Sequence, residues 1–513
     1  MNDNIENNGI PDAFRSKVEK NHRQKAAKAG TESDDKPKPA SAGDLIQLAH
    51  SGCDIRRRDD GRAYAVAKGL GVFLDSDTFR GFLSNLARRC GFAPAHKSTM
   101  EDAILCLQDD AKDTEPIPVH LRVARTETGV WIDNIGQDGR LVHIANGRWS
   151  LVDRGADAGA PVFERPDEMR PLPVPSEDHG DRLDAFWEVI NCAERDRGLL
   201  AGWMVYVLTH ESNPFPLLLL DAEQGSGKSS SMNAILELVD PSGIEAGKLQ
   251  KDERDTAIVC EHLWCLRYDN ISSMDTNKQD MFCRISTGGG YATRSLYRNR
   301  DLATFRFMRP VVMNSISLPA LRPDLAQRTV RLELPRIPAE NRQTDAAFKA
   351  RKEQLKPMLF GCLLSLCAKV EQMLETEPNL ANPPRMADYA ATLHAIDQIT
   401  GWNSLDSYRA QQRQLSDESI SEEPIALALE KIAEQFRLPW EGTSKELLEK
   451  FPETLGYDLP TWKSMPQSAG DVTRSLKRCA QSMRAKGWTI DRRTGTGPTS
   501  GTAIWHIKAP AEL

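Results

Sequence analysis

Four apolar segments in the middle of the chain predict the strands of one sheet. The first, FPLLLLD (215–221), is a continuous apolar run, typical of a strand that is buried on both faces. Three more follow at 262–269 (HLWCLRYD), 307–314 (FMRPVVMN) and 329–335 (TVRLELP), with helical or hairpin patterns between them. Strands that alternate with helices predict an α/β core with a largely parallel sheet. A long helical pattern at 347–374 is expected to cover this sheet as a lid.

The segments on either side of this core have different patterns. Residues 44–175 combine two helical segments with short alternating strands, which predicts an N-terminal α+β domain whose role stays open. The proline-rich stretch 171–181 is expected to link it to the core at 182–403. Residues 404–424 are polar and predict a second linker. Residues 425–513 have the order helix, helix, helix, strand, glycine-rich turn, strand, which predicts a winged-helix domain.

Composition narrows the class of protein. The chain has 513 residues, of which 40% are hydrophobic and 27% charged, enough for several globular domains. No run reaches the ~20 apolar residues of a bilayer span, and the ten cysteines form no CxxC pair, so we expect a reduced, cytoplasmic protein without a membrane segment. Residues 1–43 are polar and predict a disordered leader. Because the net charge is −7, any nucleic-acid site must be a local basic patch.

The strongest chemical signal is the segment AEQGSGKSS (222–230), which follows the first core strand and opens a helical stretch. This is the context of a phosphate-binding P-loop. Gly225 and Gly227 allow a tight turn that points backbone amides at phosphate oxygens. Lys228 can then reach the β- and γ-phosphates, and Ser229 can hold Mg²⁺. We therefore expect ATP and Mg²⁺ as cofactors. The predicted binding residues are Glu223, Gln224, Gly225, Ser226, Gly227, Lys228, Ser229 and Ser230.

Three residues further along complete the predicted catalytic set with Lys228. Asp269 ends the second core strand and is expected to hold Mg²⁺ together with Ser229. Asn314 ends the third strand and is expected to orient an attacking water. Arg328, in the segment RPDLAQR before the last strand, is placed to reach the γ-phosphate of a neighbouring subunit as an arginine finger, with Arg322 as a second candidate. The alternative is a surface arginine that pairs with Asp324.

One arginine-rich segment predicts contacts to single-stranded DNA. Residues 284–309 carry six arginines against one acid, beside a triple-glycine turn and two tyrosines. Cationic side chains there can grip phosphates, and aromatic side chains can stack on bases. The candidates are Arg294, Tyr297 and Arg298. The alternative is a hairpin whose arginines form salt bridges between subunits.

A second basic segment predicts contacts to double-stranded DNA. Residues 471–493 hold seven basic residues against two acids. At helical spacing Arg474, Lys477 and Arg478 share one face, which can enter the major groove. The alternative is a protein-interaction module, because winged helices serve in that role too.

The order of these motifs resembles that of the AAA+ ATPases. More narrowly, it is similar to the ring-forming helicases of superfamily 3, to the poxvirus-type primase-helicases of phages and integrated elements, and to bacterial ATP-binding proteins of prophages. The segments that carry the likeness, strongest over 180–340, are AEQGSGKSS, DERDTAI, WCLRYDNIS, ISTGGGYATRSLY, RPVVMNSI and RPDLAQR. The resemblance implies a homo-oligomeric ring, with a hexamer favoured, that hydrolyses ATP at subunit interfaces and moves single-stranded DNA with a pore hairpin. It also implies a replication partner such as a primase.

One departure from that family pattern keeps two functions open. AAA+ motors usually have a glutamate after the strand-ending aspartate, but this chain has Asn270, which cannot act as a base. Either another carboxylate takes that role or hydrolysis is slow. The candidates are Glu223, Glu253 and Asp255. The chain is thus expected to be an ATP-dependent DNA helicase or replication-initiation ATPase, or alternatively an ATP-gated DNA-binding regulator without motor activity. A small-molecule kinase would explain the P-loop alone.

Overall fold

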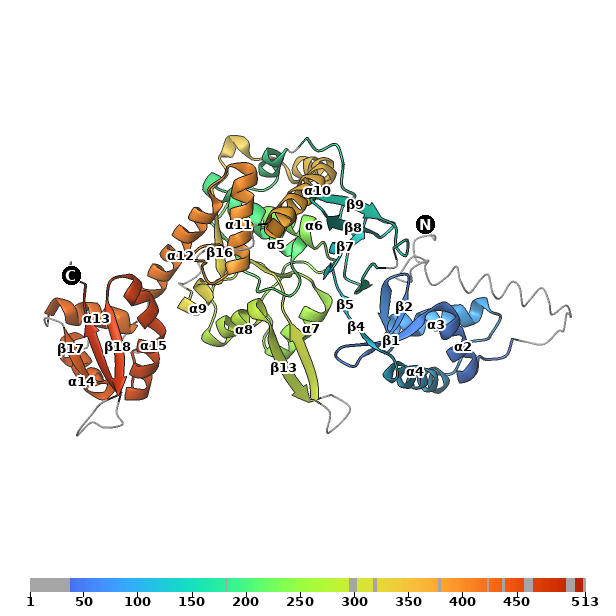
Figure 1. Cartoon of the computed structure of the whole chain (residues 1–513), viewed down its shortest axis with the longest axis horizontal. Helices are drawn as coiled ribbons and strands as arrows, with labels where there is room; N and C mark the ends of the chain where they lie inside the picture. Colours follow the sequence, from blue (N-terminus) through green and yellow to red (C-terminus); the bar gives the residue numbers. More distant parts are fainter. Residues whose placement is uncertain are drawn as a thin grey trace.

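The computed structural model describes residues 37–157, 159–180, 182–294, 302–316, 321–376, 380–421, 424–435, 439–455, 465–494 and 503–510. These residues form an N-terminal lobe, a central body and a C-terminal domain, which follow one another along the molecule (Figure 1).

The central body is built on a sheet with the strand order β12-β15-β11-β16. Its strands are β11 (Leu217–Ala222), β12 (Leu266–Tyr268), β15 (Val311–Ser315) and β16 (Thr329–Leu334). All neighbouring pairs are parallel, so the four apolar segments form the predicted α/β sheet. In a parallel sheet the carboxyl ends of the strands lie at one edge, and the loops after β11, β12 and β15 therefore meet there.

Helices cover both faces of this sheet. Leu218 and Leu220 pack into a core with α5 (Arg197–Thr209), α6 (Lys228–Val239), α10 (Asp345–Thr376) and α11 (Ala387–Thr400). Leu217 and Leu219 point the other way, because side chains alternate along a strand. They pack with α7 (Glu253–His262), α8 (Thr276–Thr287) and the short α9 (Pro323–Ala326). Short 3-10 turns lie at Leu183–Glu188, Glu194–Asp196 and Ala339–Asn341.

Helix α10 spans the segment 347–374 that the sequence predicts as a long helix. By length and composition alone it could cross a membrane. Its apolar residues, however, are packed in the core of the body against α5, α11 and β8 (Arg140–Ala145). A core helix of a globular protein has this arrangement, so its apolar character is explained by burial.

The N-terminal lobe has its own sheet and its own core. The strand order is β4-β1-β2-β3-β10-β5, and the helices α2, α3 and α4 pack with it. The elements are α2 (Ala42–Gly52), β1 (Asp54–Arg58), β2 (Ala63–Ala67), β3 (Leu70–Phe73), α3 (Asp77–Arg89), α4 (Lys97–Lys112), β4 (Pro116–Ile117), β5 (Val119–His120) and β10 (Val162–Glu164). The predicted leader (1–43) extended too far, because Ala40 is buried and Ser41 forms a capping box with Asp44. Residues 1–36 lie outside the described ranges.

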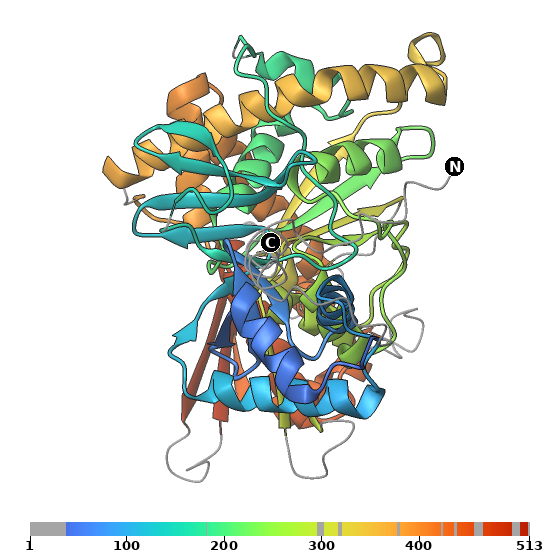
Figure 2. The same ribbon diagram turned by 90° about the vertical axis from the view of Figure 1, so that its right-hand side faces the viewer.

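The predicted boundary of the N-terminal domain at residue 175 also needs correction. An antiparallel sheet of β6 (Val123–Thr126), β7 (Gly129–Ile135), β8 and β9 (Arg148–Val152) shares the core of the central body. Figure 2 shows these strands beside α10. Leu172, in the predicted linker 171–181, is buried in the same core. The alternating pattern predicted the strands but could not say which layer they would join.

The second predicted linker is a packed helix. Residues Ser404–Ser421 form α12, which buries Leu405 and Tyr408 in the core. Its polar side chains are used against the exposed edge of β16: Gln412 Nε2 donates to the carbonyl of Thr329 at 2.8 Å, and Gln411 Oε1 accepts from the amide of Arg331 at 2.8 Å. Its polar composition therefore reflects contacts to a strand edge.

The C-terminal domain has the predicted order of elements with one additional strand. They are α13 (Pro424–Gln435), β17 (Trp440–Thr443), α14 (Ser444–Leu455), α15 (Ala469–Ala485), β18 (Thr489–Thr494) and β19 (Ala503–Lys508). The sheet is antiparallel in the order β17-β19-β18 and packs with the helices around a separate core.

Candidate functional site

The glycine-rich loop joins the buried strand β11 to α6. Gly225 has φ 85° and Gly227 has φ 71°, a left-handed conformation that glycine adopts at little cost. Gly227 precedes α6, and no side chain caps the amino terminus of that helix. A Cβ atom at Gly227 would lie 3.1 Å from Ile337 Cδ1. The loop therefore offers the unpaired amides of a helix start to an anion, and its two turns require glycine.

The inner side of the loop is held by side chains. Ser226 is buried, and its hydroxyl donates to the carbonyl of Glu223 at 2.9 Å. Asn191 Nδ2 donates to the carbonyls of Ser226 at 2.8 Å and of Pro335 at 2.6 Å. Asn191 lies in irregular chain before α5 and belongs to none of the predicted motifs, so no sequence pattern pointed to it. The remaining loop positions, Gln224 and the helical Ser230, are exposed.

The predicted catalytic residues of the strand ends lie together in one hydrogen-bonded cluster. Ser229 Oγ donates to Asp269 Oδ1 at 3.2 Å, and Asn314 Nδ2 donates to the same oxygen at 2.6 Å. Lys228 Nζ donates to Asn270 Oδ1 at 3.3 Å. Three segments that are far apart in the sequence thus converge at the carboxyl edge of the sheet. A hydroxyl and a carboxylate at this distance suit Mg²⁺, which usually takes few protein ligands besides phosphate oxygens.

Asn270 has a backbone conformation that fits its side chain. Its φ is 56°, in the left-handed region, where asparagine is one of the few non-glycine residues that occur regularly. Its amide N–H donates to Asn314 Oδ1 at 2.7 Å. Asn314 therefore holds both Asp269 and the turn that follows it, and it is fully buried.

None of the three proposed substitute bases contacts this cluster in the described part of the chain. Glu253 is ion-paired with Arg284. Glu223 is exposed at the start of the loop, and Asp255 is exposed near the amino end of α7. The identity of a general base stays a prediction.

Arg328 directly precedes β16 and therefore lies at the amino ends of the strands, whereas the loop lies at their carboxyl ends. Thr329, the next residue, pairs with Leu217 at the start of β11, whereas Leu334 pairs with Ala222 at its end. Arg328 is 8% exposed, and its Nη1 contacts Asp324 Oδ2 at 2.6 Å. Burial alone would raise the pKa of Asp324, but the hydrogen bond from Arg328 and the neighbouring positive charges bring it below its ordinary value. The pairing with Asp324, which the sequence left as an alternative, is present.

The arginine-rich segment between β12 and β15 forms an antiparallel hairpin. Its strands are β13 (Gly289–Arg294) and β14 (Leu302–Phe307), with Arg294 opposite Leu302, and they project from the body (Figure 1). Arg294 is the last described residue of β13, and Tyr297 and Arg298 lie outside the described residues. Arg309, at the base of the hairpin, donates to the carbonyl of Cys260 at 2.9 Å and lies over the Trp264 ring. Its contacts are therefore with the central body.

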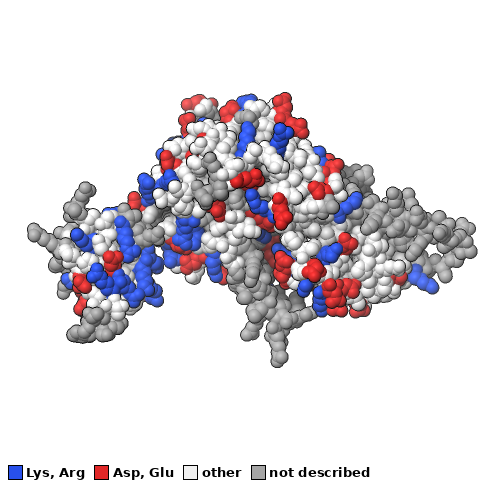
Figure 3. All heavy atoms as spheres, in the orientation of Figure 1, with Lys and Arg blue, Asp and Glu red and all other residues white. Residues whose placement is uncertain are grey.

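The basic residues of α15 form one exposed face. Val472, Leu476 and Cys479 on the other side of the helix are buried in the core of the C-terminal domain. Arg474, Lys477 and Arg478 are exposed, as are Arg492 and Arg493 on β18. Figure 3 shows lysine and arginine side chains gathered over the part of this domain that carries α15.

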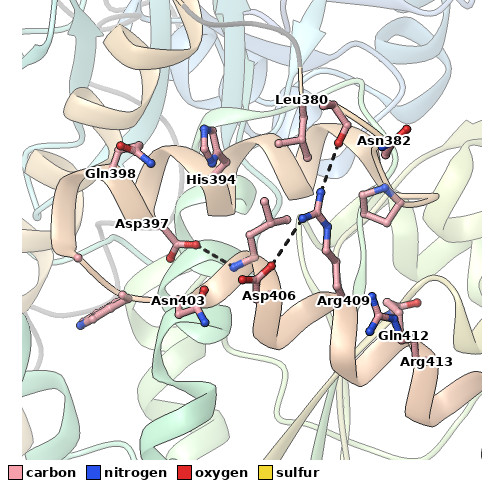
Figure 4. Close-up of a pocket in the computed structure, with 15 residues that line it drawn as sticks. Leu380, Asn382, His394, Asp397, Gln398, Asn403, Asp406, Arg409, Gln412 and Arg413 are labelled. Carbon is pink, nitrogen blue, oxygen red and sulfur yellow. Dashed lines mark hydrogen bonds and ion pairs between the residues drawn. The ribbon is translucent and has the colours of Figure 1, made fainter.

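A groove of about 980 Å³ lies apart from the loop and its cluster, between α11, α12 and the segment 380–384 (Figure 4). Asp397 caps α12 by accepting from the amide of Leu405 at 2.9 Å, and Arg409 Nη2 donates to the carbonyl of Ala381 at 3.3 Å. Asp397 and Arg409 thus form hydrogen bonds that hold the segments of the groove wall together.

Two family models match this chain. Residues 183–418 match the actinomycete integrative conjugative element replication protein, and residues 425–512 match the C-terminal domain of the same proteins, AICE RepA. The chain belongs to this family of replication proteins. The first family model covers the central body without its β6–β9 sheet, together with most of α12, and the second covers the C-terminal domain, so this replication protein of a mobile element carries both parts.

The comparison with solved structures found distant likenesses. An SCCmec type IV Cch protein described as an active helicase has a TM-score of 0.45 at 11% identity, over 90% of this chain and 93% of that chain. The C-terminal region of NrS-1 has a TM-score of 0.36 at 8% identity, over 92% and 100%. The JCV helicase has 0.25 at 13%, over 47% and 65%. A comparison with curated proteins found no match. The family assignment rests on the two family models.

Proposed function

We propose that this replication protein is an ATP-driven DNA helicase or replication-initiation ATPase. The supporting observation is the cluster in which Lys228, Ser229, Asp269 and Asn314 meet beside a left-handed glycine turn at the carboxyl edge of a parallel sheet. A bound ATP·Mg²⁺ would supply the triphosphate and the metal charge. The uncapped amides of α6 and Lys228 would hold the phosphates, and Ser229 and Asp269 would hold the metal.

The chemistry of the donor set fits a metal that arrives with its nucleotide. In the described part of the chain no group of three or more histidine, cysteine, aspartate or glutamate side chains could hold a metal ion alone. One hydroxyl and one carboxylate leave most of the octahedral positions of Mg²⁺ to phosphate oxygens and water. Asn314 would keep Asp269 in place and orient a water near the terminal phosphate.

In this proposal hydrolysis takes place between subunits of a ring, for which a hexamer is favoured. The arginines at the far edge of the sheet, Arg328 among them, belong to the face that would meet the nucleotide of the next subunit. The projecting β13–β14 hairpin would contact single-stranded DNA through Arg294, Tyr297 and Arg298. The C-terminal domain, as a winged helix, would bind duplex DNA through α15. A primase is the expected partner in replication.

Asn270 favours a second function, an ATP-gated DNA-binding regulator without motor activity. The side-chain amide of Asn270 cannot accept a proton from water, and its Oδ1 accepts a hydrogen bond from Lys228. In this alternative, ATP would set the assembly state without being consumed in strand separation.

ATP turnover measured with and without single-stranded DNA, together with mass measurement in a non-hydrolysable analogue, tests the proposal. We expect DNA-stimulated turnover and an analogue-dependent ring, both lost in Lys228→Ala. Lys97→Ala, which changes a lysine exposed on the N-terminal lobe, is the matched control. Analogue-dependent DNA binding without turnover would favour the regulator. A single chain that binds no nucleotide would reject both.

A further inference from the structure

Three arginines share two carboxylates at the amino-terminal edge of the central sheet. Arg328 and Arg385 both contact Asp324, at 2.6 Å and 2.8 Å respectively. Arg322 Nη1 contacts Asp280 Oδ1 at 2.5 Å. Among these five side chains one positive charge is therefore unbalanced. This excess positive charge is available to an anion that approaches this edge.

Exposure distinguishes the two arginines on Asp324. The Arg328 side chain is 9% exposed, and its Nη1 also donates to the carbonyl of Asp324 at 2.7 Å, which holds it on α9. The Arg385 side chain is 40% exposed, and its other contact is with Gln327 Oε1 at 3.1 Å. A flexible arginine can leave a solvent-exposed ion pair at little cost, because such pairs contribute about 0–1 kcal/mol. Arg385 is thus the more accessible member of the pair.

Arg385 cannot serve the glycine-rich loop of its own chain. Its partners Asp324 and Gln327 precede β16, whose first residue pairs with Leu217, and the loop begins six strand positions later, after Ala222. Those positions span roughly 20 Å at ~3.3 Å per residue, more than an arginine side chain can reach. An anion at this edge must come from another molecule.

We propose that Arg385 reaches the triphosphate held by the glycine-rich loop of a second copy of this chain, and that Arg328 is a positioning residue that holds Asp324 beneath it. This inference rests on the proposed function and assigns the contact to a residue outside the RPDLAQR segment. The edge formed by α9 and Arg385 is then the surface that faces the partner's nucleotide. The guanidinium stabilises charge on the transferring phosphate and takes no part in a covalent step.

A mixing experiment distinguishes a contact between copies from a contact within one chain. Lys228→Ala removes the loop lysine but leaves Arg385, whereas Arg385→Ala leaves the loop intact. We expect each variant alone to lose ATP turnover, Arg385→Ala by about a thousandfold. In a one-to-one mixture about a quarter of the interfaces combine an intact loop with an intact arginine, so part of the activity returns. Failure to recover activity in co-assembled mixtures would overturn the proposal.

Further variants separate this role from structural effects. Arg80→Ala changes an arginine of similar exposure on α3 of the N-terminal lobe, paired with Asp77 at 3.7 Å, and should keep full turnover. Arg328→Ala should lower the melting temperature, whereas Arg385→Ala should not. Turnover of Arg385→Ala equal to wild type would also overturn the proposal.

The wild type could bind ATP without hydrolysing it, and that result would reject the ATP-driven motor. The contact of Arg385 with the nucleotide of a second copy can still be tested in that case. The readout is then the mass of the assembly in a non-hydrolysable analogue. Arg385→Ala should shift it toward single chains while the single chain still binds the analogue, and Lys228→Ala should lose binding itself. An unchanged assembly in Arg385→Ala would refute the contact.

Discussion

Asn314 Nδ2 donates a 2.6 Å hydrogen bond to Asp269 Oδ1, and Asn314 Oδ1 accepts from the amide that follows Asp269. One buried amide thus fixes both the carboxylate and the turn at the end of β12. Asparagine can do so because its side chain has a donor and an acceptor, and an aspartate or leucine of similar size lacks one or both.

Replacing Asn314 tests this arrangement. We expect Asn314→Ala to lower the free energy of unfolding by about 1–3 kcal/mol, since it leaves buried polar groups without partners. Asn314→Asp should change the Mg²⁺ dependence of nucleotide binding more than Asn314→Ala does, because a second negative charge would lie beside Asp269. Chemical denaturation and nucleotide titration at several Mg²⁺ concentrations measure the two effects. Equal metal dependence in the two variants would contradict the role assigned to Asn314.

Asn270 allows a test that separates backbone from side chain. Asn270→Ala should destabilise the protein by about 1 kcal/mol, because alanine pays a steric cost at a φ of 56°. Asn270→Gly allows the left-handed backbone conformation without strain, but it also removes the side-chain oxygen that accepts a hydrogen bond from Lys228. If the left-handed turn determines stability, the glycine variant melts close to wild type. If both variants melt alike, the bond to Lys228 is the larger contribution.

The grouping of Lys228, Asp269 and Asn314 could be predicted from the sequence because its signals are local. A continuous apolar run followed by a polar residue marks the carboxyl end of a buried strand, and parallel strands bring such ends together. Lys228, Asp269 and Asn314 could therefore be placed at one edge without knowledge of the packing. Asn191 could not, because a single amide in irregular chain carries no pattern.

The segment 404–421 shows where this reasoning fails. A polar segment is expected to be exposed to solvent. In the structure, however, Gln411 and Gln412 form hydrogen bonds with the edge of β16. Glu418 accepts two hydrogen bonds from Arg331, at 2.8 Å and 2.9 Å. An open strand edge needs such partners. The strands β6–β9 were likewise predicted as elements, but their placement in the body depends on contacts distant in sequence.

The buried carboxylate Asp240 connects the end of α6 to β12. Its oxygens accept from Arg122 Nη2 at 2.9 Å and from Arg267 Nη2 at 2.8 Å, and it is 2% exposed. Removal of one partner from a buried ion pair typically costs about 3–5 kcal/mol, so Asp240→Ala should lower the free energy of unfolding by that amount. Asp109→Ala, which breaks an exposed pair with Lys112, should change it by less than about 1 kcal/mol. Comparable losses would contradict this assignment.

His210 predicts a loss of stability in weak acid. Burial, with the nearby charge of Arg125, lowers the pKa of its imidazole from 6.5 to about 3. Between these values the unfolded chain binds a proton that the folded chain does not, so the free energy of unfolding falls as the pH drops below 6.5. At pH 5 the contribution is about 2 kcal/mol. Denaturation at pH 7.5 and pH 5 should show a smaller difference in His210→Gln, and an unchanged difference would place the titration elsewhere.

The exposed face of α15 gives the test of duplex DNA binding. If Arg474, Lys477 and Arg478 contact phosphates, each loss should weaken binding and reduce the slope of log affinity against log salt by about 1, because one fewer counterion is released. Glutamine at each position removes the charge and leaves the buried side of the helix unchanged. Lys445→Gln, an exposed change on α14 of the same domain, is the control and should keep the full slope. Anisotropy titrations of a labelled duplex across salt concentrations measure it. Wild-type slopes in all three variants would exclude α15 as the DNA-binding face and leave the C-terminal domain as a protein-interaction module.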